Sequence, residues 1–359
     1  MNTIFFALGT RPEIIKLAPI IRRVQLANLP FSIVHTNQHY DHALDGIFFE
    51  ELGLPKPDYN LQAAASRHGE MLGLMFPLFE NTFTKKRPSV VVVQGDTNSA
   101  FAAAFMAKRL GIPVAHVEAG LRSDDWTMPE EMNRVLVDRI SDRLYVPTAH
   151  QIKRLQQEGI ADQHILLTGN PIADAVREHK EQALQTELPP VLASLLLNRF
   201  CLLTLHRPAL VDHPALLVSL LQKIDAYLAS HAMRACFLVH PRTRQKLPAS
   251  LELSSIVLHE PVGYFAMLHL LQKATLLLTD SGGLQEEAAL LHVPCITLRD
   301  NTERPETIAA GGNDLVGFDG TKLMTAMRKF LTEPVQWKPL YEIESPSDAI
   351  VADLLLHYL

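Results

Sequence analysis

The chain has 359 residues, of which 47% are hydrophobic and 20% charged, values that are ordinary for a globular protein. Because one hydrophobic core rarely grows this large, we expect two domains of about 150 to 180 residues each. The net charge of −6 and the pI near 6.2 exclude the basic surface of a nucleic-acid-binding protein, although a local site for a small anion remains possible.

The apolar segments give no sign of a targeting or membrane sequence. Met1–Leu8 lacks a basic leader and a cleavage site, and no later run reaches the roughly 18 apolar residues of a membrane span, so we expect a cytoplasmic protein. Cys201, Cys236 and Cys295 are odd in number and lie in apolar runs, which predicts buried core residues. The histidines form no ligand-spaced cluster, so we expect no metal site.

Short apolar runs, each followed by a segment of helix length, predict a parallel sheet in each half of the chain. The strands expected in the first half are Thr3–Leu8, Phe31–Thr36, Ser89–Gln94, Pro113–Glu118, Leu144–Val146 and Ile165–Thr168. After a Leu-, Gln- and Glu-rich stretch at Glu178–Asn198 come the strands expected in the second half, Phe200–Leu205, Ala235–Val239, Ser255–Leu258, Thr275–Thr279 and Cys295–Leu298.

The pattern therefore predicts an α/β fold of two Rossmann-like domains, residues 1–170 and 171–345, with a cleft between them. A last amphipathic segment, 346–359, is expected to be a helix, and the pattern does not show which domain it packs on. Ligands of open parallel sheets bind at the carboxyl ends of the strands, so the residues that follow each strand are the first candidates for a site.

The segment Asp280–Glu287 (DSGGLQEE) follows an apolar strand and opens a helix. Gly282 and Gly283 allow a phosphate to approach the backbone behind Ser281, where the N–H groups of the first helical turn can donate to it. Glu287, one turn further on, can accept from ribose hydroxyls and so favours a nucleotide over free phosphate. An N-capped helix with glycines for close packing remains the alternative.

The first expected strand ends in Gly9–Glu13 (GTRPE), with Lys16 about one turn into the next helix. Arg11 and Lys16 can supply a forked donor and a point charge to a diphosphate. Neither the NTPase phosphate loop nor the dinucleotide-binding fingerprint is present, and no cofactor is predicted. A plain Arg-Pro-Glu helix start with a surface lysine is the alternative.

Carboxylates follow the next strands of the first half. Asp96 and Glu118 end two successive strands, which suits one acid and one base at the same sheet edge. Asp96 can instead cap the following helix, and Glu130, on a loop that leads into a helix, can simply complement the helix dipole. His206 ends the first strand of the second half, where it either faces a departing diphosphate or is structural.

Taken together, these segments resemble the non-hydrolysing UDP-N-acetylglucosamine 2-epimerases over about residues 3–310. The motifs that carry the resemblance, in order, are Gly9–Glu13, Gln94–Thr97, His116–Ser123, Pro129–Arg134, Thr168–Asn170, His206-Arg207, Asp280–Glu287 and Thr302–Glu306. The hydrolysing epimerases instead tend to open with a Gly-Ser-Arg-Ala-Glu-Tyr type of turn, which this chain lacks.

The resemblance implies a GT-B-like fold with the active site in the interdomain cleft, UDP-N-acetylglucosamine and UDP as partners, and a homodimer. The residues it implies for UDP binding are Arg11, Lys16, His206, Met267, Ser281, Gly282, Gly283, Glu287 and Arg304. The residues it implies for catalysis are Asp96, Glu118 and Glu130, with Arg11 and His206 stabilising the departing UDP. Met267 stands where an aromatic side chain often packs against uracil.

Two further departures concern the surroundings of the nucleotide. Pro208 and Ala209 stand where the family usually has Glu-Asn after His206-Arg207. Many members also bind a second UDP-N-acetylglucosamine as an activator, for which Gln38, Arg207 and His240 match the pocket, whereas Asp41 stands where an uncharged residue is common.

The chemistry expected of these residues is an elimination. The C2 proton of the sugar is not adjacent to a carbonyl group, but breakage of the C1–O bond to UDP places positive charge at C1 and acidifies that proton. Anti elimination then gives 2-acetamidoglucal and UDP, and re-addition from the other face gives the epimer. A GT-B glycosyltransferase that uses a UDP-sugar donor and a nucleotide-sugar sensor without turnover are the alternative functions.

Overall fold

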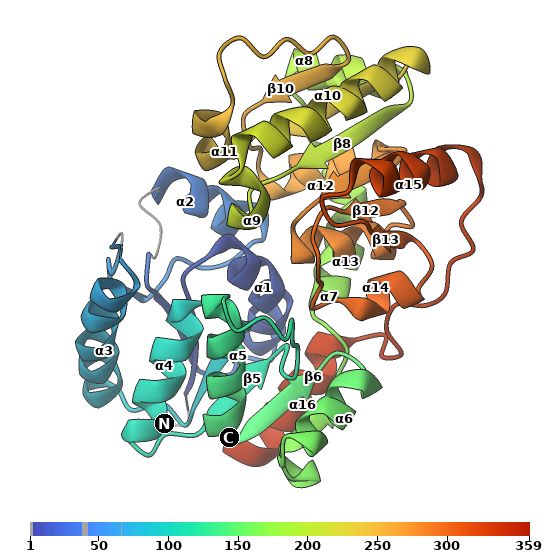
Figure 1. The fold of residues 1–359 in the computed structure, drawn as a ribbon. Helices are drawn as coiled ribbons and strands as arrows, with labels where there is room; N and C mark the ends of the chain where they lie inside the picture. The colour runs from blue at the N-terminus through green and yellow to red at the C-terminus, as the bar shows by residue number, and fades with distance from the viewer. Residues whose placement is uncertain (1–2, 38–41, 66) are drawn as a thin grey trace. The chain divides into compact units, whose positions relative to one another are not determined.

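The computed structural model describes residues 3–37, 42–65 and 67–359 and shows two compact units (Figure 1). Unit 1 comprises Met1–Ala175 together with Tyr341–Leu359, and unit 2 comprises Val176–Leu340. Helix α7 (Ile172–Ala183) carries the chain from one unit to the other. The two units are described in turn.

Unit 1 is built on a parallel sheet of strand order β3-β2-β1-β4-β5-β6-β7. Its strands are β1 (Ile4–Leu8), β2 (Phe31–His35), β3 (Tyr59–Asn60), β4 (Val90–Gln94), β5 (Val114–Val117), β6 (Arg143–Val146) and β7 (Ile165–Leu167). In the register of β4 and β5, Gln94 pairs with Val117. The residues that follow these two strands, Asp96 and Glu118 among them, therefore come out at the same edge of the sheet.

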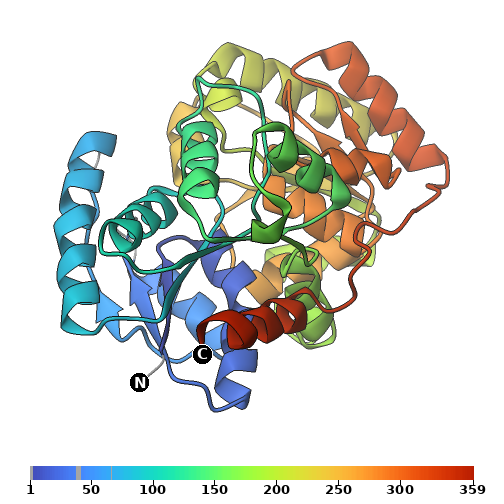
Figure 2. The ribbon, with the colours of Figure 1, turned by 90° about the horizontal axis from the view of Figure 1, so that it is seen from below.

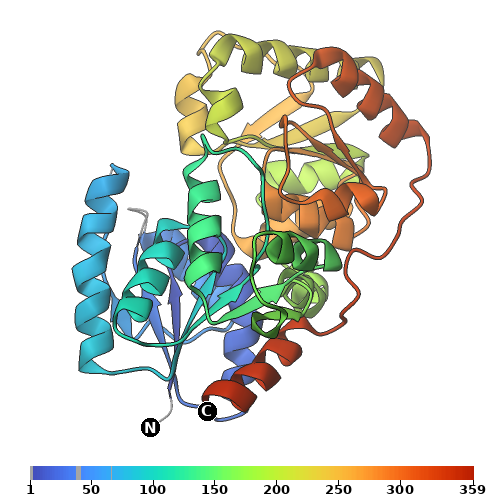
Figure 3. The same ribbon diagram turned by 60° about the horizontal axis from the view of Figure 1, so that its bottom comes forward.

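The helices of unit 1 lie between successive strands, as expected for right-handed crossovers. They are α1 (Arg11–Leu26), α2 (His42–Glu51), α3 (His68–Lys85), α4 (Asn98–Arg109), α5 (Pro129–Ile140) and α6 (Ala149–Gln157), with a 3₁₀ turn η1 at Asp162–His164. Helices α3, α4 and α5 pack side by side on one face of the sheet (Figure 3). Apolar side chains of α3 and α4 make the core there with Phe5, Val91 and Val93 of the strands.

The C-terminal helix α16 (Pro346–Tyr358) belongs to unit 1, where it packs beside α1 (Figure 2). Asp353 of α16 accepts from Nε of Arg143 at 2.9 Å and from the Tyr145 hydroxyl at 2.9 Å. At the start of the helix, the Ser347 N–H donates to Asp174 at 2.7 Å. The helix that the sequence left unplaced is thus joined to β6 and α7 by buried or half-buried polar contacts.

Unit 2 repeats the architecture with strand order β10-β9-β8-β11-β12-β13, and all its strand pairs are parallel. Its strands are β8 (Phe200–Thr204), β9 (Arg234–Leu238), β10 (Ile256–His259), β11 (Leu276–Thr279), β12 (Cys295–Thr297) and β13 (Asn313–Leu315). Its helices are α8 (Pro190–Ala193), α9 (Pro208–Val211), α10 (Pro214–Ser230), α11 (Pro241–Lys246), α12 (Tyr264–Lys273), α13 (Gly282–Leu290), α14 (Pro305–Ala309) and α15 (Gly320–Thr332), with a 3₁₀ turn η2 at Ser194–Leu197.

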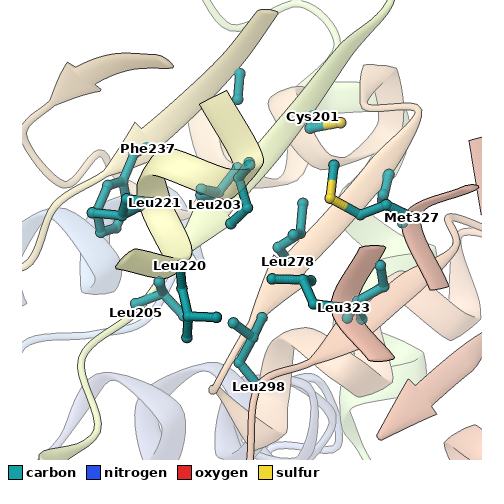
Figure 4. Packing of buried hydrophobic residues seen from close by; sticks show 14 of the residues in the cluster. Cys201, Leu203, Leu205, Leu220, Leu221, Phe237, Leu278, Leu298, Leu323 and Met327 are labelled. Atoms are coloured by element: carbon teal, nitrogen blue, oxygen red, sulfur yellow. The ribbon is translucent and has the colours of Figure 1, made fainter. Parts of the chain in front are cut away.

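The core of unit 2 is a sheet face packed against α10 and α15 (Figure 4). Leu203, Phe237 and Leu278 of the strands meet Leu220 of α10 and Met327 of α15, and all are almost completely buried. A second apolar cluster lies between the other face of this sheet and α12. Both faces are therefore covered by helices.

These observations confirm the predicted fold class, with two parallel-sheet α/β units. The cysteines Cys201, Cys236 and Cys295 are free and buried, as expected. The sequence missed β3 and β13, which are edge strands of only two and three residues. In the part of the chain that the structure describes, no helix combines the length and apolarity needed to cross a membrane.

Candidate functional site

Glu118 is a buried carboxylate at the unit 1 sheet edge, with 5% of its surface exposed. It follows β5 directly and has a backbone φ of 70°, a left-handed conformation that glutamate rarely adopts. Its Oε1 accepts from Lys16 Nζ and, at 2.8 Å, from Asn170 Nδ2, while its Oε2 accepts from Gln94 Nε2. A lysine and two amides from three different elements thus orient this carboxylate.

Asp96 lies at the same edge but is more exposed. Its carboxylate is paired with the guanidinium of Arg134 of α5, and its carbonyl accepts from Asn133 at 2.9 Å. The alternative that Asp96 caps a helix is wrong, because Thr97 is the N-cap of α4 and accepts from Ala100 N at 3.0 Å. The Asp96 side chain is therefore not used by the helix that follows it.

The two glutamates of the Pro129–Arg134 segment lie in different surroundings. Both are in the first turn of α5, which begins at Pro129, so Glu130 lies on the helix and not on the loop before it. Glu131 is buried and accepts from Ser123 N, at 2.9 Å, and from Arg134, at 2.9 Å, so it holds the preceding loop. Glu130 is half-buried. Of this pair, Glu130 is the one with surface left to meet a ligand.

The β1–α1 turn supplies the two cations that the sequence singled out. Arg11 is half-buried and its guanidinium carbon lies 5.4 Å from the centre of the Phe48 ring. Lys16 is 3% exposed and forms the ion pair with Glu118. The sequence-based expectation was a lysine that donates to a diphosphate, whereas the structure places its ammonium group on a carboxylate.

His116, Asp138 and Arg122 form a buried network of polar contacts next to the end of β5. His116 contacts Asp138 through Nδ1 at 2.7 Å and the Gly95 carbonyl through Nε2 at 2.9 Å. Arg122 donates to Asp138 at 2.7 Å. Burial by itself would raise the pKa of Asp138, but His116 and Arg122 outweigh it and the pKa lies below its ordinary value. These charges hold the turns that carry Gly95 and Glu118.

In unit 2, His206 and Asp280 form a pair at the ends of β8 and β11. The His206 Nδ1 lies 3.0 Å from Asp280 Oδ1, and Oδ2 accepts from the backbone N–H of His206 and Arg207 at 2.8 Å each. Burial would raise the pKa of Asp280, but His206 and these N–H groups lower it. Asp280 thereby fixes the imidazole with its Nε2 pointing away from the carboxylate.

Helix α13 starts at Gly282 with Ser281 as its N-cap, and the Ser281 side chain makes no capping bond. A Cβ atom at Gly282 would come within 2.9 Å of Glu303 Oε1, so a larger residue there would displace the Glu303 side chain. At Gly283 a Cβ atom would meet nothing within 4 Å. Glu287 is 5% exposed. The pKa of the Tyr264 hydroxyl is raised mainly because the group is buried, and next because it lies close to Glu287.

The other predicted nucleotide-binding side chains of unit 2 have the following surroundings. Nε of Arg304 lies 2.9 Å from Oε2 of the buried Glu286. Met267, on α12, is half-buried and packs against the apolar cluster of that face. Glu286 therefore orients the Arg304 guanidinium, and Met267 is part of the apolar packing around α12.

Of the three residues predicted for an activator pocket, the structure describes Arg207 and His240. His240 is exposed and caps α11, accepting from Arg242 N at 3.2 Å, and its ring centre lies 6.1 Å from that of His206. Arg207 is half-buried, 3.9 Å from Glu303. Gln38 and Asp41 lie outside the described residues. Among the residues that are described, no group of three or more His, Cys, Asp or Glu side chains could hold a metal ion.

Sequence reasoning missed the two amides on Glu118. Asn170 directly follows the turn after β7, so the strand-end rule that selected Glu118 also applied to it. Gln94 is the last residue of β4 and reads from the sequence as part of the strand. Its contact with Glu118 depends on the register between β4 and β5, which no local pattern gives.

Comparison with known proteins identifies the family. The family model described as UDP-N-acetylglucosamine 2-epimerase matches residues 23–354. The chain belongs to this family. It is 47% identical, over 92% of its length and 93% of the relative, to the UDP-N-acetylglucosamine 2-epimerase of Methanocaldococcus jannaschii. It is 39% identical, over 92% of each chain, to the UDP-2,3-diacetamido-2,3-dideoxy-D-glucuronate 2-epimerase of Pseudomonas aeruginosa.

Solved structures of 2-epimerases agree with the family assignment. The crystal structure of the M. jannaschii UDP-GlcNAc 2-epimerase in complex with UDP-GlcNAc and UDP has a TM-score of 0.91 and 44% identity to this chain. The similarity covers 99% of this chain and 100% of that one. The family that the sequence motifs indicated is therefore confirmed over the full architecture.

Proposed function

We propose that this protein interconverts UDP-N-acetylglucosamine and UDP-N-acetylmannosamine by eliminating and re-adding UDP. The observation that carries the proposal is a buried carboxylate, Glu118, held in a strained conformation at the sheet edge of a chain that belongs to the 2-epimerase family. Strained residues of this kind concentrate at active sites, because the surrounding structure must maintain them.

In the proposed reaction, unit 2 binds the UDP part of the substrate. The first turn of α13, which follows Ser281, offers backbone N–H groups to the diphosphate. Arg304 adds the donors of its guanidinium group, and His206 adds an imidazole N–H. Asp280 orients His206, as the 3.0 Å contact shows. Arg11 of unit 1 completes the set of cations, while Lys16 stays paired with Glu118. The combined role of the UDP-binding groups is to stabilise negative charge on UDP as the C1–O bond breaks.

The carboxylates of unit 1 handle the proton at C2. One of Asp96, Glu118 and Glu130 removes that proton while the C1–O electron pair leaves with UDP, which gives 2-acetamidoglucal. In the second step, a protonated group delivers a proton to the opposite face of C2, and a UDP oxygen re-forms the bond to C1. Glu118 is oriented by amides and a lysine, and Asp96 by Arg134, so the two carboxylates enter the reaction with different partners.

The proposal is tested by incubating the protein with UDP-N-acetylglucosamine in D2O and following C2 by NMR. The expected result is a manno-configured product with deuterium at C2. Transfer of the sugar only when an acceptor is added would indicate a glycosyltransferase instead, and an unchanged substrate would indicate a sensor. Either of these two results would overturn the proposed function.

The assignment of the carboxylates is tested with Asp96→Asn and Glu118→Gln. Each substitution should lower kcat by about 10²- to 10⁴-fold, the range typical of a lost general acid or base. Glu80→Gln, at an exposed position of α3, is the matched control and should leave kcat unchanged. Near-normal turnover in both site variants would show that the proton is handled elsewhere.

We also propose that the protein is a homodimer, as the sequence resemblance implies. Large apolar side chains are exposed on neighbouring helices of unit 1, at Leu74 of α3, Phe105 of α4, and Met132 and Leu136 of α5. Exposed apolar side chains on adjacent helices are typical of surfaces that contact another chain.

A further inference from the structure

Glu13 is a fully buried carboxyl group to which the proposed reaction assigns no role. It is the last residue of the Gly9–Glu13 motif and lies in the first turn of α1 with 0% of its surface exposed. Its Oε2 accepts from Gly9 N at 2.9 Å and from Thr10 Oγ1 at 2.8 Å. Its Oε1 accepts from Thr97 Oγ1 at 2.7 Å. The carboxyl group therefore joins two turns that are more than 80 residues apart in the chain.

The two turns joined by Glu13 carry residues of the proposed site. Gly9 and Thr10 lead directly into Arg11, and Thr97 directly follows Asp96. Thr97 also caps α4, so its hydroxyl is fixed on both sides, accepting from Ala100 N and donating to Glu13. Gly9 is enclosed as well, since a Cβ atom there would lie 2.0 Å from Thr36 Oγ1 and 2.2 Å from Ser99 Oγ. Neither turn can shift without disturbing the other.

The partners of Glu13 are hydroxyl and backbone N–H groups. Among the described residues, no charged side chain of α1, β1 or the β4–α4 turn forms an ion pair with Glu13. The charged groups on these elements point to other partners: Lys16 is paired with Glu118, Asp96 with Arg134, and Arg11 lies over Phe48. Burial raises the pKa of Glu13 to about 7, although its hydrogen bonds act in the opposite direction.

We propose that Glu13 is a positioning residue that holds the Gly9–Arg11 and Asp96–Thr97 turns in the one arrangement that suits catalysis. The inference rests on the proposed function for the roles of Arg11 and Asp96, and on the geometry of this structure for the rest. The ionised carboxyl group accepts from all these donors in the observed arrangement, whereas a proton on one oxygen makes that oxygen a donor, so that a threonine hydroxyl must rotate to accept it. The active arrangement is therefore the one with Glu13 ionised.

A pH dependence follows from this proposal. As pH rises through about 7, Glu13 loses its proton and kcat should rise. Stability changes in the opposite direction. Because the pKa is raised in the folded state, ionisation disfavours folding progressively between the ordinary value of 4.5 and about 7. The melting temperature of the wild type should thus fall across this pH range, relative to that of a variant with no ionisable group at position 13.

The test compares the full-length wild type with Glu13→Gln and with Glu80→Gln as the matched exposed control. Glu13→Gln should lower kcat about tenfold to a hundredfold, the loss expected when catalytic groups are slightly misplaced. Its kcat should lack the rise near pH 7, and its melting temperature should not show the relative fall. Amide hydrogen exchange at residues 9–13 and 96–100 should be faster than in the wild type. Glu80→Gln should match the wild type in every measurement.

A second pair of variants keeps the test valid if Glu13→Gln does not fold. Thr10 makes no capping bond to α1, so Thr10→Val removes a donor to Glu13 without removing a helix cap. Because that donor lowers the pKa of Glu13, its loss should move the rise in kcat to higher pH. Thr10→Ser, which keeps the hydroxyl group, should return the rise to its wild-type position.

Failure of this inference and failure of the proposed function give different results. Inactivity of the wild type in the D2O experiment would overturn the proposed function, and the exchange and melting data would still decide whether Glu13 holds the two turns. Wild-type exchange at both turns in Glu13→Gln, or an unchanged pH profile of kcat in an active variant, would overturn the inference. A merely structural role would lower the melting temperature at every pH and leave the kcat profile in place.

Discussion

Glu118 has a backbone conformation that costs about 1–3 kcal/mol for a residue with a side chain. Its partners come from the helix α1, the strand β4 and the turn after β7. Asn170 is the partner whose orientation is best defined, because its Oδ1 accepts from Ile172 N at 3.1 Å and leaves the NH₂ group to donate to Glu118. The carboxylate is thus positioned before any substrate arrives.

We predict that Asn170→Ala lowers kcat without unfolding the protein. A hydrogen bond to a charged group contributes about 1.5–3 kcal/mol, which corresponds to roughly 10- to 150-fold in rate. Steady-state kinetics measures the loss, with Asn198→Ala, an exposed position in unit 2, as the control. A normal kcat in a folded Asn170→Ala protein would show that Lys16 and Gln94 are sufficient to orient Glu118.

For single residues, the sequence indicates which side chains lie at the ends of the strands, but not which other side chains they contact. The strand-end rule selected Asp96, Glu118 and His206, since a strand-end position is a local property. The pairing of Lys16 with Glu118 depends on how α1 packs against β4, the neighbour of β5, and that of Arg134 with Asp96 on how α5 packs beside α4. The capping alternative for Asp96 fails because Thr97, the next residue, is also a good cap and takes that position.

At the scale of elements, α16 is the segment whose position depends most on contacts distant in the chain. Its buried side chains Ile350, Val351 and Leu354 each contribute about 1.5–3 kcal/mol on burial. Asp353 adds the contacts to Arg143 and Tyr145 of β6. Burial and Asp353 together raise the pKa of the Tyr145 hydroxyl well above its ordinary value. The amphipathic pattern predicts this helix, but it does not specify the neighbour.

We predict that a chain ending at Leu340 keeps unit 2 folded and strongly destabilises unit 1. The apolar clusters of unit 2 contain no residue beyond position 340, whereas α1 and β6 lose the partners that α16 supplies. Hydrogen exchange should show wild-type protection in β8, β9 and β11 and much faster exchange in α1 and β6. Equal protection of both units would mean that α16 is dispensable, and loss of protection in both would mean that the units fold together.

Strand prediction succeeded for runs that are almost wholly apolar, which include the short edge strands β7 and β10 as well as the inner strands. Strands β1, β4 and β8 each have five consecutive buried residues, which is the pattern of an inner parallel strand. Strands β3 and β13, also at sheet edges, contain Asn60 and Asn313-Asp314 in place of an apolar run. Their pairing depends on the neighbouring strand, and a sequence pattern cannot show it.

At the scale of the whole molecule, the proposed homodimer would use the exposed apolar side chains of helices α3, α4 and α5. Helices α3, α4 and α5 pack side by side, and Phe105 and Leu136 are 38% and 40% exposed on the second and third of them. Phe105 also lies 5.9 Å from Phe101 and 5.4 Å from Phe76, ring centre to ring centre, so its ring is held in place. An aromatic side chain that is both rigid and exposed loses little conformational entropy when a partner covers it.

We predict that the wild type has twice the chain mass of 40.1 kDa in solution and that Phe105→Asp together with Leu136→Asp makes it a monomer. Burying two carboxylates in an apolar interface costs several kcal/mol each, enough to separate a dimer at micromolar concentration. Light scattering after size-exclusion chromatography measures the mass. Leu26→Asp, at the 81% exposed end of α1, is the control and should remain dimeric. A wild-type monomer would contradict the proposed dimer, and a dimer that survives both substitutions would place the interface on another face of the protein.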